Sequence, residues 1–134
     1  MKLLLDTHIL LWYVTNDSKL SVQAKTWIDD LQNEVYYSLV SLWEVSIKHQ
    51  ISSSKMPVSD EELSVYAEQS GIRCLNLTKR HISLIKTLHR NENAKPHHDP
   101  FDRILICQAK AENMMFITHD SLIPDYGESC VVFV

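Results

Sequence analysis

The chain has 134 residues, of which 45% are hydrophobic and 22% charged, a composition that predicts one globular domain over residues 1–134. The formal net charge of −4 argues against binding of nucleic acid by bulk positive charge, so such a substrate needs a local basic patch, metal ions or a basic partner. The three cysteines are widely spaced without a C-x-x-C pair, and no segment is typical of a signal peptide or a membrane span. We therefore expect a reduced, cytoplasmic protein that does not contact the membrane.

The first third of the chain alternates between strand and helix patterns. Residues 3–5 form a short apolar run typical of a strand buried on both faces, and residues 9–14 indicate a buried helical segment. Ser21 is a good N-cap for a helix to about residue 33. Residues 35–38 are rich in β-forming side chains and predict a second strand.

In the middle of the chain, capping residues indicate where the helices begin. Ser41 is followed three residues later by Glu44, a capping-box pattern that predicts a helix starting at Ser41 and ending near residue 50. Ser59 and Glu62 make a second capping box. The run 72–77 is a third strand candidate.

The last third predicts two helices and two strands. Thr78 caps a helix to about residue 89, and Asp99–Pro100 is a strong helix start for a segment reaching about residue 113. Residues 115–118 and 130–134 are strand candidates. Strands that alternate with helices predict an α/β fold with a mostly parallel central sheet of four to five strands and helices on both faces.

Four carboxylates lie near the expected carboxyl ends of the strands. Asp6 ends the first strand, Asp120 follows the fourth, and Glu44 and Asp102 lie early in the helices that we expect at residues 41–50 and 99–113. Open α/β sheets bind ligands beyond the carboxyl ends of their strands. Clustered carboxylates repel one another unless a divalent cation joins them, and hard oxygen ligands without thiolates favour Mg²⁺ or Mn²⁺. The pattern predicts metal-assisted hydrolysis of a phosphodiester.

Each of these carboxylates also has a structural interpretation. Glu44 completes the expected capping box, Asp102 favours a helix dipole, and Asp120 suits a turn. Asp99 is better explained as an N-cap than as a ligand. The functional hypothesis therefore depends on several carboxylates converging on one rim and not on any single residue.

Four segments also carry a family resemblance. They are Leu3–His8, Ser41–Lys48, His98–Ile106 with its Asp-Pro-Phe-Asp sequence, and Phe116–Asp120. In this order and over nearly the whole chain, the sequence resembles PIN-domain ribonucleases, in particular the toxin halves of VapBC-type toxin–antitoxin pairs.

The resemblance implies a PIN-like three-layer α/β/α sandwich and a Mg²⁺- or Mn²⁺-dependent endoribonuclease. The catalytic and metal-binding positions of the family carry over to Asp6, Glu44, Asp102 and Asp120, with Asp6 and Asp102 as the firmest ligands. Further residues expected to support the site or contact substrate are Asp99, Thr7, Thr118 and Arg103. The implied partners are an RNA substrate, a second copy of the chain, and an antitoxin that covers the active site and carries the DNA-binding function, so no direct DNA binding is expected without it.

Histidines and tryptophans leave other interpretations open. His97 and His98 beside Asp99 could indicate zinc, but no further ligand lies at finger-like spacing, and we expect loop histidines to be solvated. Either histidine could contact a substrate phosphate. The three tryptophans occupy apolar positions and favour a place in the core or a dimer interface over base stacking.

Three other classes of protein compete with the nuclease hypothesis. A haloacid-dehalogenase-type phosphatase needs Asp-x-Asp after the first strand, whereas Thr7-His8 follows Asp6. An RNase H-like nuclease needs early hairpins, and the sequence has no Asn-Gly or Asp-Gly hairpin signal. A PIN-fold RNA-binding or regulatory module without catalytic activity would be expected to lack at least one acidic position, and all of them are present.

Overall fold

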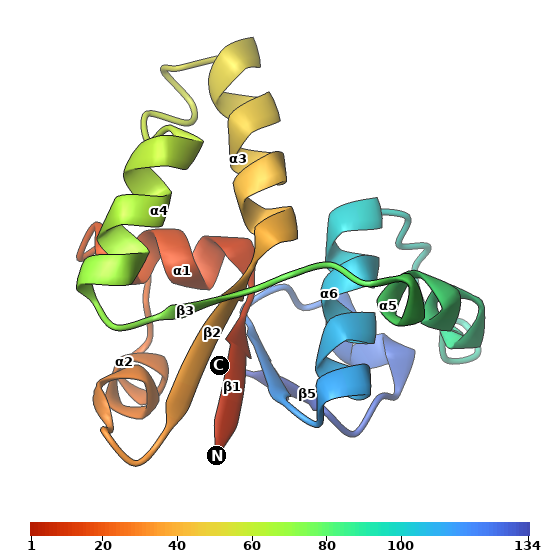
Figure 1. Ribbon diagram of the computed structural model, residues 1–134. Helices are drawn as coiled ribbons and strands as arrows, with labels where there is room; N and C mark the ends of the chain where they lie inside the picture. Colours follow the sequence, from red (N-terminus) through yellow and green to blue (C-terminus); the bar gives the residue numbers. More distant parts are fainter.

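The structure is a computed structural model that describes residues 1–134, and its centre is a five-stranded sheet. All strand pairs are parallel and the strand order is β3-β2-β1-β4-β5 (Figure 1). The elements in chain order are β1 (Lys2–Leu5), α1 (Thr7–Val14), α2 (Val22–Asp29), β2 (Glu34–Ser38), α3 (Leu39–Ile51), α4 (Asp60–Gln69), β3 (Arg73–Leu75), α5 (Lys79–Ser83), η1 (Leu84–Thr87), α6 (Pro100–Glu112), β4 (Met115–Thr118), η2 (Ile123–Tyr126) and β5 (Val131–Phe133).

The three leucines of the central strand β1 are completely buried, because the strand separates two hydrophobic cores. Leu3 and Leu5 lie in one core and Leu4 in the other, as the two-residue period of a strand requires. The first core is built with residues of α1, α2 and α4, and the second with residues of α6 and the segments around it. Helices therefore cover both faces of the sheet, which confirms the predicted α/β/α sandwich.

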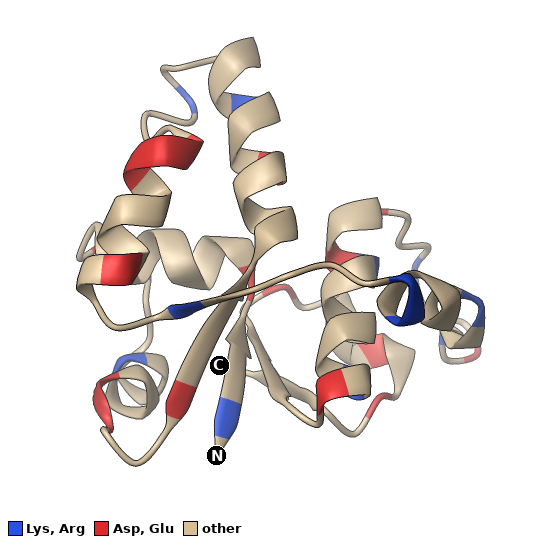
Figure 2. Cartoon of the chain, viewed as in Figure 1, with Lys and Arg blue, Asp and Glu red and all other residues tan.

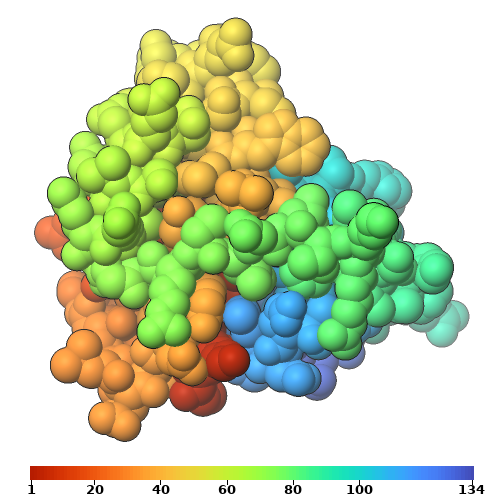
Figure 3. All heavy atoms as spheres, in the orientation of Figure 1, coloured from red at the N-terminus to blue at the C-terminus, as the bar shows by residue number.

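The helices α3 and α4 project beyond the carboxyl ends of the strands as a helical hairpin (Figure 1). After α4, the chain crosses the front of the molecule through β3 to reach α5, visible as the green band in Figure 3. None of the helices combines the length and the apolar character that crossing a bilayer would require. The hairpin thus extends one end of the molecule, and this is the end of the sheet at which open α/β sheets bind their ligands.

Three of the predicted helices differ from the structure. The helix expected from Ser21 to about residue 33 ends at Asp29, because the backbone becomes extended at Asp30. The helix expected to start at Ser41 begins at Leu39, because the hydroxyl of Ser38 caps it by accepting from the Val40 N–H at 3.0 Å. Ser41 is buried inside the first turn. The helix expected from Thr78 to about residue 89 is instead the short α5, followed by one 3₁₀ turn. The capping boxes at Ser59 and Thr78 are both formed, the second with His81 in place of an acidic residue.

Candidate functional site

The rim at the carboxyl ends of β1 and β4 holds the first pair of acidic residues. β1 pairs with β4 in parallel, with Leu5 opposite Ile117, and the Asp6 N–H donates to the Ile117 carbonyl at 2.9 Å. Asp6 follows β1 directly and Asp120 follows β4 after one residue. The register of two neighbouring strands therefore places both aspartates at the same edge.

A cavity of about 310 Å³ opens at this rim. Its lining includes the four predicted catalytic carboxylates Asp6, Glu44, Asp102 and Asp120 and the predicted supporting residue Asp99. The other lining residues are His8, Trp12, Lys48 and His119. Segments as far apart in the sequence as Asp6 and Asp120 thus meet in one polar cavity, and the four predicted carboxylates converge there. Arg103 is half-buried and does not line this cavity.

Asp6 is held by donors on both carboxylate oxygens. The Thr7 N–H donates to Oδ1 at 2.7 Å and the Thr118 hydroxyl donates to Oδ2 at 2.6 Å. Burial raises the pKa of Asp6 to about 6, while these two hydrogen bonds act in the opposite direction. A carboxyl fixed in this way is oriented at the rim but is costly to keep ionised without a nearby cation.

Glu44 is buried, although it lies in the second turn of α3 and not in the first as predicted. The Thr7 hydroxyl donates to Oε1 at 2.8 Å and Lys48 Nζ contacts Oε2 at 2.5 Å. The predicted capping role of Glu44 is therefore wrong, because Ser38 caps the helix. Thr7 bridges the first two acidic positions, with its backbone on Asp6 and its side chain on Glu44.

Asp102 is the carboxyl group at the rim whose pKa is raised the most. Burial raises its pKa to about 8, and the negative charges of Asp6, Asp99, Glu44 and Asp120 add to the effect. The side chain is only 12% exposed. A protonated Asp102 relieves this repulsion in the metal-free protein, and a bound cation would relieve it with the carboxylate ionised.

Asp99 caps α6 as the sequence predicted. Its Oδ1 accepts from the N–H groups of Phe101 at 2.9 Å and Asp102 at 3.2 Å, and Pro100 occupies the first helical position. Asp120 is partly exposed and uses Oδ1 to accept from the Leu122 N–H at 2.9 Å. Its other oxygen, Oδ2, faces the cavity side and lies 3.9 Å from His97 Nε2.

His97 is the residue whose position the sequence did not indicate. We expected a solvated loop histidine, but His97 is buried, with Nε2 3.1 Å from Asp102 Oδ2 and Nδ1 2.7 Å from the Tyr126 hydroxyl. Its neighbour His98 is exposed, as expected. The only signal in the sequence was the adjacency of His97 to the Asp-Pro-Phe-Asp segment, and the decisive partner, Tyr126, lies 29 residues away.

The donor set fits a divalent cation. One group of ligand atoms, from His97, Asp102 and Asp120, lies within 4.8 Å of one another. Asp6 and Glu44 add carboxylate oxygens around the same cavity, and no cysteine takes part. Oxygen-rich sites of this kind suit Mg²⁺ or Mn²⁺, and the buried, mutually repelling carboxyls give such an ion a direct electrostatic role.

The parallel α/β sandwich and its acidic rim define a PIN-like architecture. The family model described as PIN domain matches residues 3–128, and the chain belongs to this family. No curated protein matches the sequence.

Two solved structures share the fold. One is the crystal structure of VapBC2 from Rickettsia felis bound to a DNA fragment from their promoter, with a TM-score of 0.66 and 14% identity over 100% of this chain and 98% of that chain. The other is a toxin–antitoxin complex from Klebsiella pneumoniae, with a TM-score of 0.54 and 20% identity over 96% of this chain and 94% of that chain. At these identities the likeness concerns the fold.

Proposed function

We propose that this protein is a metal-dependent endoribonuclease that hydrolyses RNA phosphodiester bonds in the cytoplasm, and that it is the toxin of a toxin–antitoxin pair. The observation that carries the proposal is the acidic cavity. Asp6, Glu44, Asp102 and Asp120 come from four segments and line one space of about 310 Å³. Membership of the PIN domain family supports the same conclusion.

The four carboxylates form the proposed metal and catalytic set. A divalent cation held by these carboxylates would supply an activated water and would stabilise the leaving oxygen of a phosphodiester. Thr118 and the Thr7 N–H hold Asp6 in a fixed orientation, and Thr7 and Lys48 do the same for Glu44. Fixed side chains lower the cost of reaching the productive geometry, so Thr7 and Thr118 act as positioning residues.

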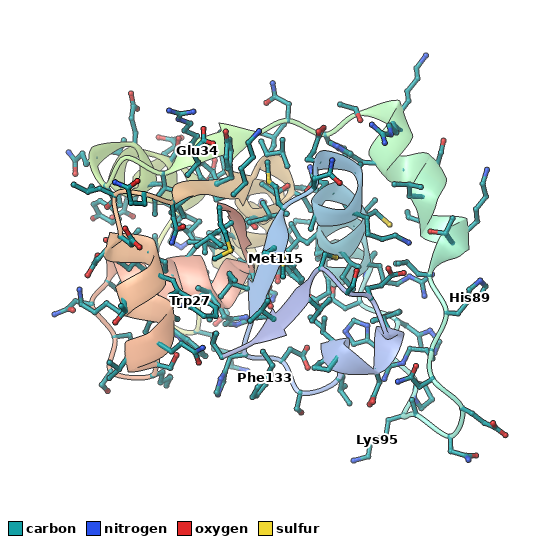
Figure 4. The ribbon with its side chains drawn as sticks, turned by 90° about the horizontal axis from the view of Figure 1, so that it is seen from below. Trp27, Glu34, His89, Lys95, Met115 and Phe133 are labelled. Carbon is teal, nitrogen blue, oxygen red and sulfur yellow. The ribbon has the colours of Figure 1, made fainter.

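Positive groups near the cavity suit a substrate with a phosphate backbone. Lys48, His8 and His119 line the cavity, and Arg103 lies one residue beyond Asp102. Farther along, α5 and the following segment carry further basic side chains, drawn blue in Figure 2: Lys79, Arg80, Lys86 and Lys95. Arg90 belongs to the same segment, but its guanidinium is largely buried and donates to the carbonyls of Leu122 and Lys95. Figure 4 shows this segment along one side of the molecule, from His89 to Lys95 at its outer end. These local charges answer the need for a basic patch in an acidic chain.

The proposed protein partners are a cognate antitoxin and a second copy of this chain. The two structures with the same fold are both toxin–antitoxin assemblies, and one of them is bound to DNA. The exposed face of α3 supports a protein contact, because four apolar side chains recur there every four residues: Leu39, Trp43, Ile47 and Ile51. Such a face is typical of a homodimer interface, which is more apolar than the average surface.

The test compares the native chain with Asp6→Asn and Asp102→Asn in two assays. We expect the native chain to arrest growth when expressed alone and to cleave RNA with Mg²⁺ or Mn²⁺, and chelation or either substitution to abolish both effects. Equal growth arrest and cleavage by the variants would refute the proposed site. Stabilisation by Mn²⁺ without any cleavage would instead favour an RNA-binding or regulatory module that has lost activity.

A further inference from the structure

The ring of His97 lies between a tyrosine and two of the proposed catalytic carboxylates. Nδ1 is 2.7 Å from the Tyr126 hydroxyl, while Nε2 is 3.1 Å from Asp102 Oδ2 and 3.9 Å from Asp120 Oδ2. The side chain of His97 is 5% exposed. Both nitrogens therefore have defined protein neighbours, and only Nε2 lies near carboxyl groups that line the acidic cavity.

The bond to Tyr126 assigns the tautomer of the ring. The Tyr126 hydroxyl donates its one proton to the backbone carbonyl of His97 at 3.2 Å. The hydroxyl oxygen must then accept in the shorter contact, so that the proton of the neutral ring is on Nδ1. Nε2 consequently presents a lone pair toward Asp102 and Asp120.

A lone pair that faces two carboxylates needs either a proton on Asp102, as in the metal-free protein, or a cation that takes the place of this proton. An unprotonated nitrogen and an ionised carboxylate repel each other at 3.1 Å, because neither offers a hydrogen. The ligand atoms of His97, Asp102 and Asp120 all lie within 4.8 Å of one another, the spacing of neighbouring ligands around one metal ion.

We propose that His97 is a metal ligand, and that its Nε2 joins Asp102 and Asp120 in holding one divalent first-row transition-metal ion. This inference rests on the proposed metal-dependent nuclease and deepens it by adding a nitrogen ligand to a carboxylate set. Imidazole favours transition metals over Mg²⁺, and among these Mn²⁺ is also well suited to carboxylates. The site therefore prefers Mn²⁺ to Mg²⁺.

Tyr126 supports His97 as an outer partner. Metal-bound histidines usually donate their second ring N–H to a protein acceptor, which fixes the tautomer and the ring orientation. Tyr126 is buried in η2, and the guanidinium of Arg90 lies 4.7 Å from the centre of its ring. The loop before α6 and the turn after β4 thus together direct one ring nitrogen toward Asp102 and Asp120.

The direct test is pulsed electron paramagnetic resonance of the full-length protein loaded with Mn²⁺ alone. A coordinated imidazole gives a ¹⁴N modulation of the Mn²⁺ signal, and we expect this modulation in the native protein. It should disappear in His97→Asn, whose amide nitrogen takes the place of Nδ1 and can still donate to Tyr126. Two matched controls, His8→Gln in the cavity lining and His98→Gln next door, should keep it.

Two outcomes would overturn the inference. One is a native Mn²⁺ complex without ¹⁴N modulation, which would mean that His97 donates Nε2–H to Asp102 and only orients it. The other is a modulation that survives in His97→Asn but is lost in His8→Gln. Circular dichroism of the metal-free His97→Asn protein checks that it folds, and Tyr126→Phe, which leaves the ring in place, should weaken the modulation without removing it.

The affinities for Mn²⁺ and Mg²⁺ provide a second test of the nitrogen ligand. Calorimetric titration with MnCl₂ and with MgCl₂ should show Mn²⁺ binding more tightly, and His97→Asn should weaken Mn²⁺ at least about tenfold while changing Mg²⁺ much less. An unchanged ratio of the two affinities would count against a nitrogen ligand. RNA cleavage is scored separately: native protein with the ¹⁴N modulation but no cleavage would refute the nuclease and leave the metal ligand standing.

Discussion

Thr118 connects two of the proposed catalytic residues. Its hydroxyl donates to Asp6 Oδ2 at 2.6 Å and accepts from the Asp120 N–H at 3.1 Å. Thr118 is completely buried. This arrangement makes Thr118 a positioning residue whose role can be measured apart from the fold.

Thr118→Val keeps the shape of the side chain but removes the hydroxyl. We expect RNA cleavage to fall by roughly ten- to a hundredfold, as for other partners that orient metal ligands. In the native protein this hydrogen bond lowers the pKa of Asp6. Its loss should therefore raise the pKa of Asp6 and move the acid limb of the pH–rate profile to higher pH. Thr118→Ser, which retains the hydroxyl, is the control and should behave like the native protein. An unmoved acid limb in Thr118→Val would show that the hydroxyl does not act on Asp6.

At the residue scale, the sequence predicted the acidic positions better than their surroundings. Asp6 and Asp120 follow strands, so the parallel sheet alone places them at one rim. Thr7 was expected to support the site, but its bond to Glu44 and the burial of His97 against Tyr126 were not readable, because these partners lie 37 and 29 residues away. Local patterns do not encode such distances.

At the element scale, the start of α6 holds both the helix cap Asp99 and the proposed catalytic residue Asp102. Asp99 accepts from two N–H groups of the first turn, and it also lines the cavity with Asp102. Capping by Asp99 fixes the turn that presents Asp102 to the rim. The capping role and a possible ligand role predict different results for the same substitutions.

We expect Asp99→Asn to keep both the thermal stability and most of the RNA cleavage, because asparagine caps helices as well as aspartate does. Asp99→Ala should lose about 1 kcal/mol of unfolding free energy, measured by denaturant titration. If Asp99→Asn instead retained full stability but lost cleavage as completely as Asp102→Asn, Asp99 would be a metal ligand. The pair of substitutions therefore separates the two roles in one experiment.

The start of α3 shows where sequence patterns mislead. Ser41 and Glu44 have the spacing of a capping box, but the hydroxyl that accepts from a first-turn N–H belongs to Ser38, three residues before Ser41. Both Ser41 and Glu44 are buried by contacts with α1, where Thr7 reaches them at 2.8 Å. Tertiary contacts thus turned an apparent cap into part of the site, while the strands, whose apolar runs are unambiguous, lie close to their predicted bounds.

The exposed face of α3 leads to a prediction about assembly. The tryptophans were expected in the core or at a dimer interface. Trp43 is 59% exposed, which leaves the interface for it, whereas Trp12 and Trp27 pack against the first core (Trp27 is labelled in Figure 4). Trp43 contacts Phe101 edge-to-face with ring centres 5.0 Å apart. An apolar stripe of this kind predicts that a second copy of the chain covers it.

Ile51→Glu places a charge on that stripe at a position 79% exposed, where the fold itself should tolerate it. We expect light scattering after gel filtration to show a dimer for the native protein and a monomer for Ile51→Glu. The matched control is Val22→Glu on α2, which is 83% exposed and lies off the stripe, and it should remain dimeric. A native protein that is monomeric at tens of micromolar would contradict the homodimer and leave the antitoxin as the occupant of this face.

At the scale of the whole molecule, the acidic rim links stability to pH. The ordinary pKa of an aspartate is 3.8, and burial raises that of Asp6 to about 6 and that of Asp102 to about 8. Between these limits the folded metal-free protein holds protons that the unfolded chain releases. Its stability must therefore fall as the pH rises through this window, and level off above the folded pKa values.

The window between pH 6.5 and 8 isolates Asp102. Below 6.5, His97 acts in the opposite direction, since burial lowers its pKa and the unfolded chain takes up a proton that the folded one excludes. Above 6.5 the unfolded histidine is already neutral and Asp6 is largely ionised in both states. Asp102 then remains as the shifted rim group still bound to a proton in the folded protein.

We therefore predict that, in EDTA, the unfolding free energy falls by up to about 1.4 kcal/mol per pH unit from pH 6.5 toward 8. Asp102→Asn, which cannot ionise, should flatten this part of the curve and be more stable than the native protein at pH 8. With Mn²⁺ present the native slope should reverse, because metal binding requires the ionised carboxylate and grows stronger as protons leave. Urea titrations at several pH values measure all three curves. A metal-free native protein whose stability rises over the same interval would show that Asp102 is ionised at the rim without a cation, and that the cavity does not depend on a metal ion to offset its charge.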